Sequence, residues 1–529
     1  MTSPNIELST HSENENQAIR TIIVNSLNNP DLSNDSVKPC HQQLDDLICG
    51  LFTAISLKVN LAACDMSITH VCPEVESFKQ IISVISLNIH QLAFLRSLGI
   101  DEKRLMNTCD AQHTLGTRYL NWSSDQQDFV LVEGEYGVPF DKVKFHHFIE
   151  RLDKFSYDEF AIAAQMARQG RFVHPNNDPS SLLSSFTYGL NVDAYSFAKL
   201  LSQCAAAFKI EAITADSLEA TMSDNGLASI NASCHSGKQR SLSADFFIDC
   251  ASKSSAIYQC FLPDKMKLES SPIKQQNKLR LCAVTQSSNR LLNILQPHAF
   301  GWSKTINTAS KTMIECQFDD TVTLEQVLSD LAQKGIECQE CDEHAVERVE
   351  QIMLKQPWQQ NCLFIGRKIC DIDTLTHDLL DILDEQLRLL FQVFPSRKAQ
   401  QNLVNFYNRN IHEQCLSLLD MVICHYQLNQ TQTSQCWLDN RQTKGSENLS
   451  HLTALFEQTG IFPEFENQFI AERKWINFLI GFGVIPQSTH PLSLNISDAE
   501  QKVMSFQHHL KALLVQLPTY EAYVATARN

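Results

Sequence analysis

The stretch 361–380, NCLFIGRKICDIDTLTHDLL, contains residue types that could hold a ligand. It predicts a short buried strand over 362–365, a turn at Gly366 and then a helix. A helix that starts after such a turn can hold an anion, because its first N–H groups are unpaired and its dipole end is positive. The turn carries Arg367 and Lys368, however, where a ligand close to the backbone would need glycine. The sequence therefore predicts the strand, turn and helix of a cofactor site, but not the glycines that would let a ligand approach the backbone.

Two other short patterns could bind a metal or transfer protons. Cys338 and Cys341 form a C-x-x-C pair with His344 three residues on, but the second pair of ligands of a structural zinc site is missing. His146 and His147 are neighbours, and neighbouring residues of a helix face different directions. We therefore expect one of these histidines to be packed, the other to be exposed, and no metal to be bound.

Glycine is scarce in this chain. Only 16 of the 529 residues are glycine, which is under half of the usual share of about 7%. Nucleotide-binding α/β proteins need glycine where the backbone meets phosphate. The only G-x-G is Gly481-Phe-Gly483, and Pro486 follows too soon for a helix to start there. The sequence contains neither G-x-G-x-x-G nor G-x-x-x-x-G-K-[ST].

The totals restrict the class of protein. A length of 529 residues predicts two to four structural units, and a net charge of −17 argues against nucleic acid or an anionic membrane surface as partner. The 18 cysteines are scattered through apolar segments rather than spaced as a disulfide framework. The chain shows no apolar signal segment and no apolar run of membrane-spanning length. We expect a cytoplasmic protein with reduced thiols.

The elements that would position these residues form an α/β fold with α+β features. Residues 1–40 are predicted to be a disordered tail, and 44–72 has the outline of a β-α-β unit. Asn225-Gly226 predicts the turn of a hairpin, and the chain is largely helical from 375 onward. The expected organisation consists of a tail, a nucleotide-binding domain with an inserted sheet, and a helical region, at 1–40, 41–395 and 396–529.

Ten segments together resemble the flavin-dependent tryptophan halogenases, which belong to the FAD-monooxygenase fold. In chain order they are RSLGIDE (96–102), GTRYLNW (116–122), KFHHFIERL (144–152), AIAAQMARQGRF (161–172), YGLNVDAYSFAKLL (188–201), ADFFIDC (244–250), WQQNCLFIG (358–366), FYNRN (406–410), HYQL (425–428) and IGFGVIPQSTHP (480–491). The resemblance implies an FAD/NAD(P)-binding Rossmann-like domain, an inserted antiparallel sheet and a mostly helical C-terminal substrate region.

The resemblance also implies a chemistry. In this family reduced FAD and dioxygen form a flavin hydroperoxide that oxidises chloride or bromide. The hypohalous species then travels through a tunnel to a lysine and a glutamate beside the substrate indole. The implied cofactor is FAD, and the implied partners are a flavin reductase, a second copy or an active paralogue, and a small aromatic ligand. The family's tunnel motif GWxWxIP corresponds to 301–307, which keeps one of the two tryptophans.

The flavin-binding positions are altered. The family's first β–α turn, GGGTAGW, corresponds by resemblance to 49–55, where Cys49, Leu51 and Ala54 replace the three fingerprint glycines. Leu51 is the most disruptive, because its side chain takes the space in which pyrophosphate approaches the backbone. Restoring these three glycines should therefore improve flavin binding. The cofactor contacts implied by the resemblance are Gly50, Phe52, Thr53 and Leu380.

The catalytic positions are altered as well. The family's lysine corresponds to Thr114 and its glutamate to Thr376, and neither hydroxyl can position an oxidised halogen or accept the arenium proton. Asp378 stands where a threonine should contact the halide, and a carboxylate there repels chloride. Tyr426 and Trp437 lie where the family builds its indole pocket.

These substitutions lead to one functional expectation and two alternatives. The sequence predicts a divergent member of the tryptophan halogenase family that is impaired or silent for halogenation. The first alternative is an active FADH2-dependent halogenase or monooxygenase that acts on tryptophan or another indole-type aromatic with altered flavin contacts. The second is a metal- or redox-responsive protein that uses Cys338 and Cys341.

Overall fold

The structure is a computed structural model that describes most of the chain. The described residues are 18–29, 40–122, 128–151, 156–234, 237–261, 268–274, 277–284, 290–339, 346–372, 375, 378–397, 400–463, 469–488, 490–494, 496 and 498–527. Thr376, Cys341 and His344 lie outside them.

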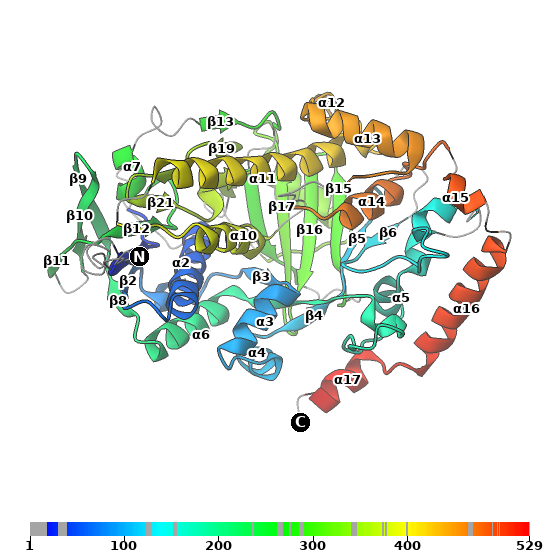
Figure 1. Ribbon diagram of the computed structural model, residues 1–529, viewed down its shortest axis with the longest axis horizontal. Coiled ribbons are helices and arrows are strands. Elements are labelled where there is room, and N and C mark those ends of the chain that lie inside the picture. The colour runs from blue at the N-terminus through cyan, green and yellow to red at the C-terminus, as the bar shows by residue number, and fades with distance from the viewer. Residues whose placement is uncertain are drawn as a thin grey trace, which may run out of the picture.

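A six-stranded sheet forms a Rossmann-like core (Figure 1). Five of its strands are parallel and the edge strand β20 is antiparallel. In spatial order the strands are β20 (Trp358–Gln359), β21 (Cys362–Phe364), β12 (Phe246–Asp249), β1 (Thr21–Asn25), β2 (Ser67–Cys72) and β8 (Glu211–Thr214). Helix α2 (His41–Asn60) connects β1 to β2, and helix α6 (Ala194–Ala207) packs beside it. The central strands are almost fully buried, as a parallel sheet covered on its faces requires.

Strand β1 overturns part of the predicted tail. Residues 21–25, TIIVN, lie in the middle of the sheet between β12 and β2. The prediction of disorder over all of 1–40 is wrong for this segment, because five apolar-rich residues suffice for a strand that is paired on both sides. The polar composition of residues 1–40, rich in Asn, Ser and Glu, outweighed this short apolar run in the prediction. Residues 1–17 and 30–39 lie outside the described ranges.

Helix α2 overturns a second expectation. The segment 44–72 does not contain the first strand of a β-α-β unit, because α2 already begins at His41. The strand of that unit is β1, and the predicted strand SITHVC is β2. The predicted β–α turn at 49–55 therefore lies in the middle of a helix.

The segment 361–380 contains more breaks between elements than predicted. Strand β21 and the turn at Gly366 are present, and Gly366 has the positive φ of 84° that favours glycine. A 3-10 turn and a short strand follow, η6 (Arg367–Ile369) and β22 (Cys370–Asp371). The predicted helix is α10, and it begins only at Leu379.

A second, larger sheet lies beside the parallel one (Figure 1). Its strands, in spatial order, are β18 (Val346–Arg348), β14 (Asn277–Cys282), β17 (Thr312–Phe318), β16 (Gly301–Asn307), β15 (Asn293–His298), β5 (Thr117–Tyr119) and β6 (Phe129–Leu131). Three small sheets consist of β11 (Gln239–Leu242), β10 (Gly226–Ser233) and β9 (Ser217–Ser223); β13 (Leu268–Ser270), β19 (Ile352–Leu354) and β22; and β3 (Val84–Leu87), β7 (Gly189–Asp193) and β4 (Gln112–Thr114). The pairing of β9 with β10 confirms the predicted hairpin, but its turn is formed by Asp224 and Asn225, since Gly226 is already paired with Ser223 as the first residue of β10.

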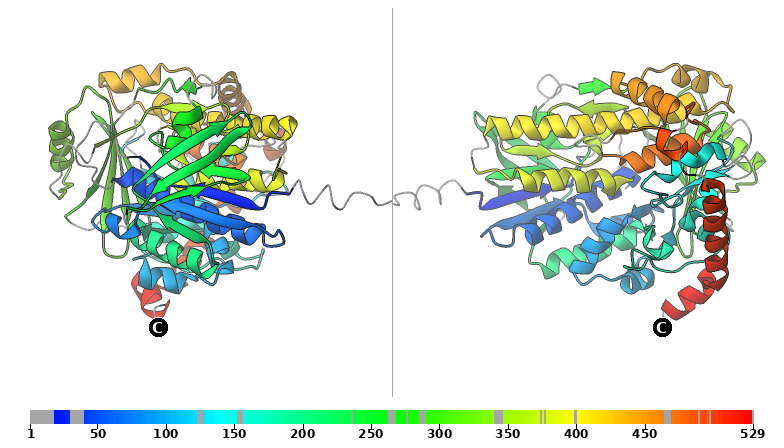
Figure 2. Two further views of the ribbon diagram at one scale, coloured as in Figure 1. Left: turned by 90° about the vertical axis from the view of Figure 1, so that its left-hand side faces the viewer. Right: turned by 45° about the vertical axis from the view of Figure 1, so that its right-hand side comes forward.

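Helices complete the molecule, mostly in its C-terminal part. The long helix α11 lies along one face above α10 (Figures 1 and 2), and α16 and α17 run down one side. The C-terminal helices are α10 (Leu379–Gln392), α11 (Gln401–Leu428), α12 (Gln435–Arg441), α13 (Glu447–Thr459), α14 (Glu472–Gly481), α15 (Pro491–Leu494), α16 (Ala499–Gln516) and α17 (Tyr520–Ala527). The earlier ones are η1 (Val75–Phe78), α3 (Ile89–Ser97), α4 (Glu102–Thr108), η2 (Phe145–Arg151), η3 (Tyr157–Phe160), α5 (Ile162–Arg168), η4 (Leu182–Ser184), α7 (Ala256–Phe261) and α9 (Leu324–Gln333).

The architecture confirms the predicted fold class, a Rossmann-like α/β core with an inserted sheet and a helical C-terminal region. The domain boundary at 395/396 stays a prediction. Among the helices of the described residues, none combines the length and the apolar character needed to cross a bilayer.

Candidate functional site

The carboxyl ends of the parallel strands are the first place to look for a ligand, because open α/β sheets bind ligands in the crevice there. Here the strand ends are bound to one another. Asn25, the last residue of β1, donates through Nδ2 to Oδ1 of Asp249 at the end of β12, at 2.8 Å. Lys368 lies 2.5 Å from Oδ2 of the same carboxylate, and both members of this ion pair are buried. Side chains of the protein therefore fill this part of the crevice.

Helix α2 covers the same edge. Gly50 lies so close to the turn after β1 that a Cβ atom there would come within 2.7 Å of Cβ of Ser26 and 2.6 Å of Nε2 of His70. Gly50 thus serves helix-to-sheet packing. Residues 41–49 precede it in the helix, which corresponds to about 13 Å of additional helix. In a dinucleotide-binding fold, by contrast, the helix N-terminus lies directly at the phosphates.

The N-terminus of α2 holds an anion that belongs to the protein. The backbone N–H of Gln42 donates to Oε1 of Glu347 at 2.9 Å. One turn further, Asp45 pairs with Arg280 at 2.6 Å, and Asp46 accepts from Nδ2 of Asn28 at 2.7 Å. A carboxylate at a helix N-terminus is favourable for the same reason that a bound phosphate is. Glu347 therefore occupies the position that would attract a phosphate.

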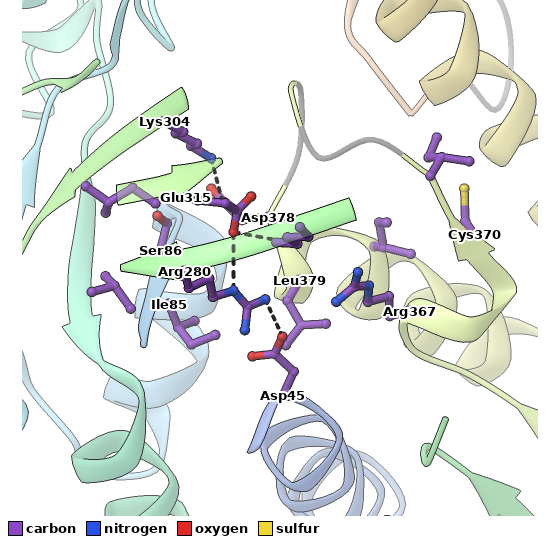
Figure 3. A pocket seen from close by; sticks show the side chains of 15 residues that line it. Asp45, Ile85, Ser86, Arg280, Lys304, Glu315, Arg367, Cys370, Asp378 and Leu379 are labelled. Atoms are coloured by element: carbon purple, nitrogen blue, oxygen red, sulfur yellow. Dashed lines mark hydrogen bonds and ion pairs between the residues drawn. The ribbon is translucent and has the colours of Figure 1, made fainter. Parts of the chain in front are cut away.

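A small cavity lies between α2 and strands β14, β16 and β17 (Figure 3). Its volume is about 50 Å³, which is room for a few water molecules. Glu315 lies 3.3 Å from Nε of Arg280 and 2.9 Å from Nζ of Lys278, and burial lowers the pKa of Lys278 to about 8. Within the part of the chain that the structure describes, Nη1 of Arg280 and Nη1 of Arg367 are buried without a hydrogen-bond partner. Water molecules in the cavity would be able to accept from these two groups.

One ion pair borders both this cavity and a larger one. Nζ of Lys304, on β16, lies 2.8 Å from Oδ1 of Asp378, the residue that precedes α10 (Figure 3). Burial lowers the pKa of Lys304, but attraction to Asp378 and Glu315 outweighs it, so that the net shift is upward. The N–H of Asp378 donates to Oδ2 of Asp381 at 3.1 Å. The carboxylate of Asp378 is thus paired with Lys304 and its backbone N–H with Asp381, at the position where the resemblance implies a halide contact.

The larger cavity has a volume of about 690 Å³ and lies between the second sheet, α10, α11 and α14. Its polar lining includes both members of the Lys304–Asp378 pair and a second pair, Lys474 and Glu133, at 2.7 Å. An aromatic lining faces the same space. It consists of Tyr119, Tyr188, His425, Phe469 and Phe478.

Two of these aromatic groups form a neutral hydrogen-bonded pair. Nδ1 of His425 lies 2.7 Å from the carbonyl oxygen of Met421, so it carries the proton and donates. Nε2 is then an acceptor, and the hydroxyl of Tyr119, at 3.0 Å, donates to it. Burial lowers the pKa of His425 to about 3, which keeps the imidazole neutral. The pair fixes the orientation of two rings in the cavity wall.

The structure brings some of the predicted site residues together and leaves others apart. Thr114 and Asp378 line the same cavity, and Oγ1 of Thr114 donates to the carbonyl of Gly116 at 3.3 Å. Tyr426 and Trp437 are fully buried and contact each other, with ring centroids 5.0 Å apart, outside the lining of this cavity. The remaining predicted contacts are buried positions of α2 and α10, namely Gly50, Phe52, Thr53 and Leu380.

Sequence reasoning missed the residues that give this cavity its character. Lys304 had a signal, because it stands at the second tryptophan of the tunnel motif in 301–307. His425 begins the segment HYQL that carried part of the resemblance. Lys474 and Glu133 had no signal, since their pairing joins the segment after β6 to α14 across more than 300 residues of chain.

Comparisons with known proteins agree with this fold. The family model described as tryptophan halogenase matches residues 50–498. The flavin-dependent halogenase BrvH from Brevundimonas sp. BAL3 superposes with a TM-score of 0.82 at 19% identity, covering 96% of this chain and 99% of BrvH. Xcc4156, a flavin-dependent halogenase from Xanthomonas campestris, gives 0.81 at 18% identity, covering 97% and 99%. The tryptophan 6-halogenase SttH from Streptomyces toxytricini gives 0.79 at 16% identity, covering 96% and 99%. The family model spans most of the described core, and the chain belongs to the tryptophan halogenase family.

Proposed function

We propose that this chain is a divergent family member that does not halogenate, and that it uses the larger cavity to bind a small aromatic ligand. Membership of the family implies FAD, whose reduced form supplies the oxidising chemistry in flavin-dependent halogenases. The proposal rests on how poorly the residues at the sheet edge fit that cofactor.

The observation that carries the proposal is the extended N-terminus of α2. A dinucleotide needs its pyrophosphate against free N–H groups at the start of this helix. Here Gln42 already donates to Glu347, and residues 41–49 extend the helix beyond Gly50, the residue that packs against the turn after β1. A pyrophosphate here would have to displace the carboxylate of Glu347 from the N–H of Gln42 and from its contacts with Arg367 and His41. The residues do not fit FAD in the manner of the family.

The substituted catalytic positions support the same proposal. Thr114 offers a hydroxyl where the family has a lysine, and it is buried with its hydroxyl bonded to Gly116. Asp378 offers a carboxylate where the family contacts halide, and it is paired with Lys304. A missing general base alone costs about 10²–10⁴-fold in rate, so several such losses on one reaction would leave no measurable halogenation.

The size and lining of the larger cavity support a small aromatic molecule as the ligand. At about 690 Å³ it is of the size that takes a small molecule. Tyr119, His425 and Phe478 are aromatic members of its lining, while the pairs Lys304–Asp378 and Lys474–Glu133 offer both signs of charge. An aromatic molecule that also carries an amino or carboxylate group matches this wall best.

Titration with FAD tests the cofactor half of the proposal. Flavin fluorescence should show no saturable binding at micromolar protein, because the helix and Glu347 stand in the way. A dissociation constant near or below the micromolar range, about −8 kcal/mol, would contradict it. The variant Glu347→Gln, which removes the competing charge but keeps the helix, should still bind poorly if the helix is the main obstacle.

A product assay tests the alternative of an active halogenase or monooxygenase. An active member would need a flavin reductase to supply reduced flavin, so the mixture contains reductase, FAD, NADH, oxygen, bromide and tryptophan or indole. Mass spectrometry should show neither brominated nor hydroxylated product above a heat-killed control. A bromine isotope doublet would overturn the proposal. Hydroxylated product without bromine would show that flavin chemistry survives and would overturn it as well.

A further inference from the structure

A cluster of two histidines and one glutamate lies outside the cavities described above. Glu102 is the first residue of α4, His113 is the middle residue of β4, and His174 follows α5. Within the described residues this is the set of metal-ligating side chains whose ligand atoms converge, all lying within 4.8 Å of one another. No motif spacing connects these residues, and the sequence predicted no metal site.

The spacing of the ligand atoms fits one ion. Oε2 of Glu102 lies 3.3 Å from Nε2 of His113 and 2.9 Å from Nε2 of His174. Zinc binds imidazole nitrogen and carboxylate oxygen at about 2.0–2.2 Å, so neighbouring ligand atoms around a tetrahedral ion are about 3.3 Å apart. The two distances from Glu102 are thus close to the separation that a shared ion requires, and the ligand atoms of the three residues all lie within 4.8 Å of one another.

The outer partners fix both imidazole rings. Nδ1 of His113 lies 3.1 Å from the hydroxyl of Tyr520, and Nδ1 of His174 lies 3.0 Å from the hydroxyl of Tyr523. Tyr188 donates to the other oxygen of Glu102. Metal-binding histidines nearly always have their second nitrogen held by such a group, which sets the ring orientation. The remaining ligand atoms, Nε2 of each histidine and Oε2 of Glu102, therefore converge.

Access to this place is one-sided. The side chain of His113 is fully buried and that of Glu102 is 14% exposed, whereas that of His174 is 41% exposed. Phe172 packs against both histidine rings and closes the inner side. Three protein ligands with a solvent-facing side leave room for water as a fourth ligand, as in zinc sites with an open position.

We propose that Glu102, His113 and His174 bind one divalent transition-metal ion of the zinc type. Tyr520 and Tyr523 both come from α17, so the ion would fasten the C-terminal helix to β4 through the rings that it orients. The competing interpretation is a metal-free network in which both Nε2–H groups donate to Glu102. The two differ in affinity for metal, which can be measured.

Calorimetric titration of the full-length, chelator-treated protein with Zn²⁺ tests the proposal. We expect one ion per chain with a dissociation constant in the micromolar range or below. His174→Ala and Glu102→Gln should each weaken binding by about tenfold or more, as the loss of a ligand or its partner does. The matched control His451→Ala, an exposed histidine of α13, should bind like the unmodified protein. Cys338→Ser should also bind normally, which separates this site from the C-x-x-C pair.

Cobalt provides a readout that does not depend on variants that fold. Co²⁺ added to the unmodified protein should give visible absorption of a four- or five-coordinate site with nitrogen and oxygen ligands, without the sulfur charge-transfer band that cysteine ligands produce. Absence of Zn²⁺ binding, zinc affinity unchanged in both ligand variants, or a sulfur band would each overturn the proposal.

Discussion

Two buried histidines couple the stability of this protein to pH. His70, on β2, bonds to Oγ of Ser26 at 2.8 Å, and His425 lies in the wall of the larger cavity. Burial lowers the pKa of each to about 3. Both are neutral in the folded state, while in the unfolded chain they take up a proton near pH 6.5.

We therefore predict that these two residues contribute to destabilisation of the fold by acid. As pH falls from 7 to 5, the unfolded state binds protons that the folded state does not, and each histidine costs about 2 kcal/mol of unfolding free energy. Urea denaturation at several pH values measures this loss. His70→Gln, which can keep the bond to Ser26, should lose less stability between pH 7 and 5 than the unmodified protein does. The exposed His508→Gln should show the unmodified pH slope.

At the scale of one element, helix α2 determines whether the carboxyl end of the parallel sheet can bind a flavin. The sequence placed the fingerprint positions Cys49, Leu51 and Ala54 at a β–α turn, where glycine would improve flavin binding. The structure places them inside α2, each almost fully buried. A β–α turn at these positions would need glycine, but α2 starts two turns earlier, so they are helical.

We predict that the triple substitution Cys49→Gly, Leu51→Gly and Ala54→Gly destabilises the protein without creating a flavin site. Each glycine in a helix interior costs about 1 kcal/mol, and removing a buried leucine side chain costs about 2–5 kcal/mol more. Chemical denaturation should show a loss of several kcal/mol. Leu51→Ala measures the packing part separately. A gain in FAD affinity by the folded triple variant would restore the original interpretation of these positions.

At the scale of the whole molecule, the larger cavity depends on parts that are distant in the chain. Its walls come from β4 and β5 early in the sequence, from β16 in the second sheet, and from α10, α11 and α14 near the end. A ligand in this space binds only the assembled fold. It therefore stabilises the entire protein against unfolding.

We predict that an indole-type amino acid raises the thermal midpoint. A ligand at 100 times its dissociation constant adds about 2.7 kcal/mol to the unfolding free energy, which is a shift of a few degrees. Ala471→Trp, which places an indole ring in the lining between Ile470 and α14, should abolish the shift. Ala207→Trp, at the exposed end of α6, should leave it unchanged. Equal shifts in both variants would place the ligand elsewhere.

The sequence by itself determined the family, the fold class and several local elements. Ten short segments in order identified the family, Asn225-Gly226 marked the hairpin to within one residue of its turn, and the helical pattern from 375 onward indicated helices such as α11. These features depend on neighbouring residues, since turn preference and helical period are local properties. That Thr114 and Asp378 correspond to the family's catalytic positions stays a prediction.

Only the tertiary structure decided which groups meet. It placed β1 at the centre of the sheet, set Glu347 at the start of α2, paired Lys304 with Asp378, and brought Glu102, His113 and His174 together. Each of these contacts joins segments far apart in sequence or lacking a spacing rule. Such convergence is fixed by how sheets and helices pack, and one chain read alone carries no periodic signal for it.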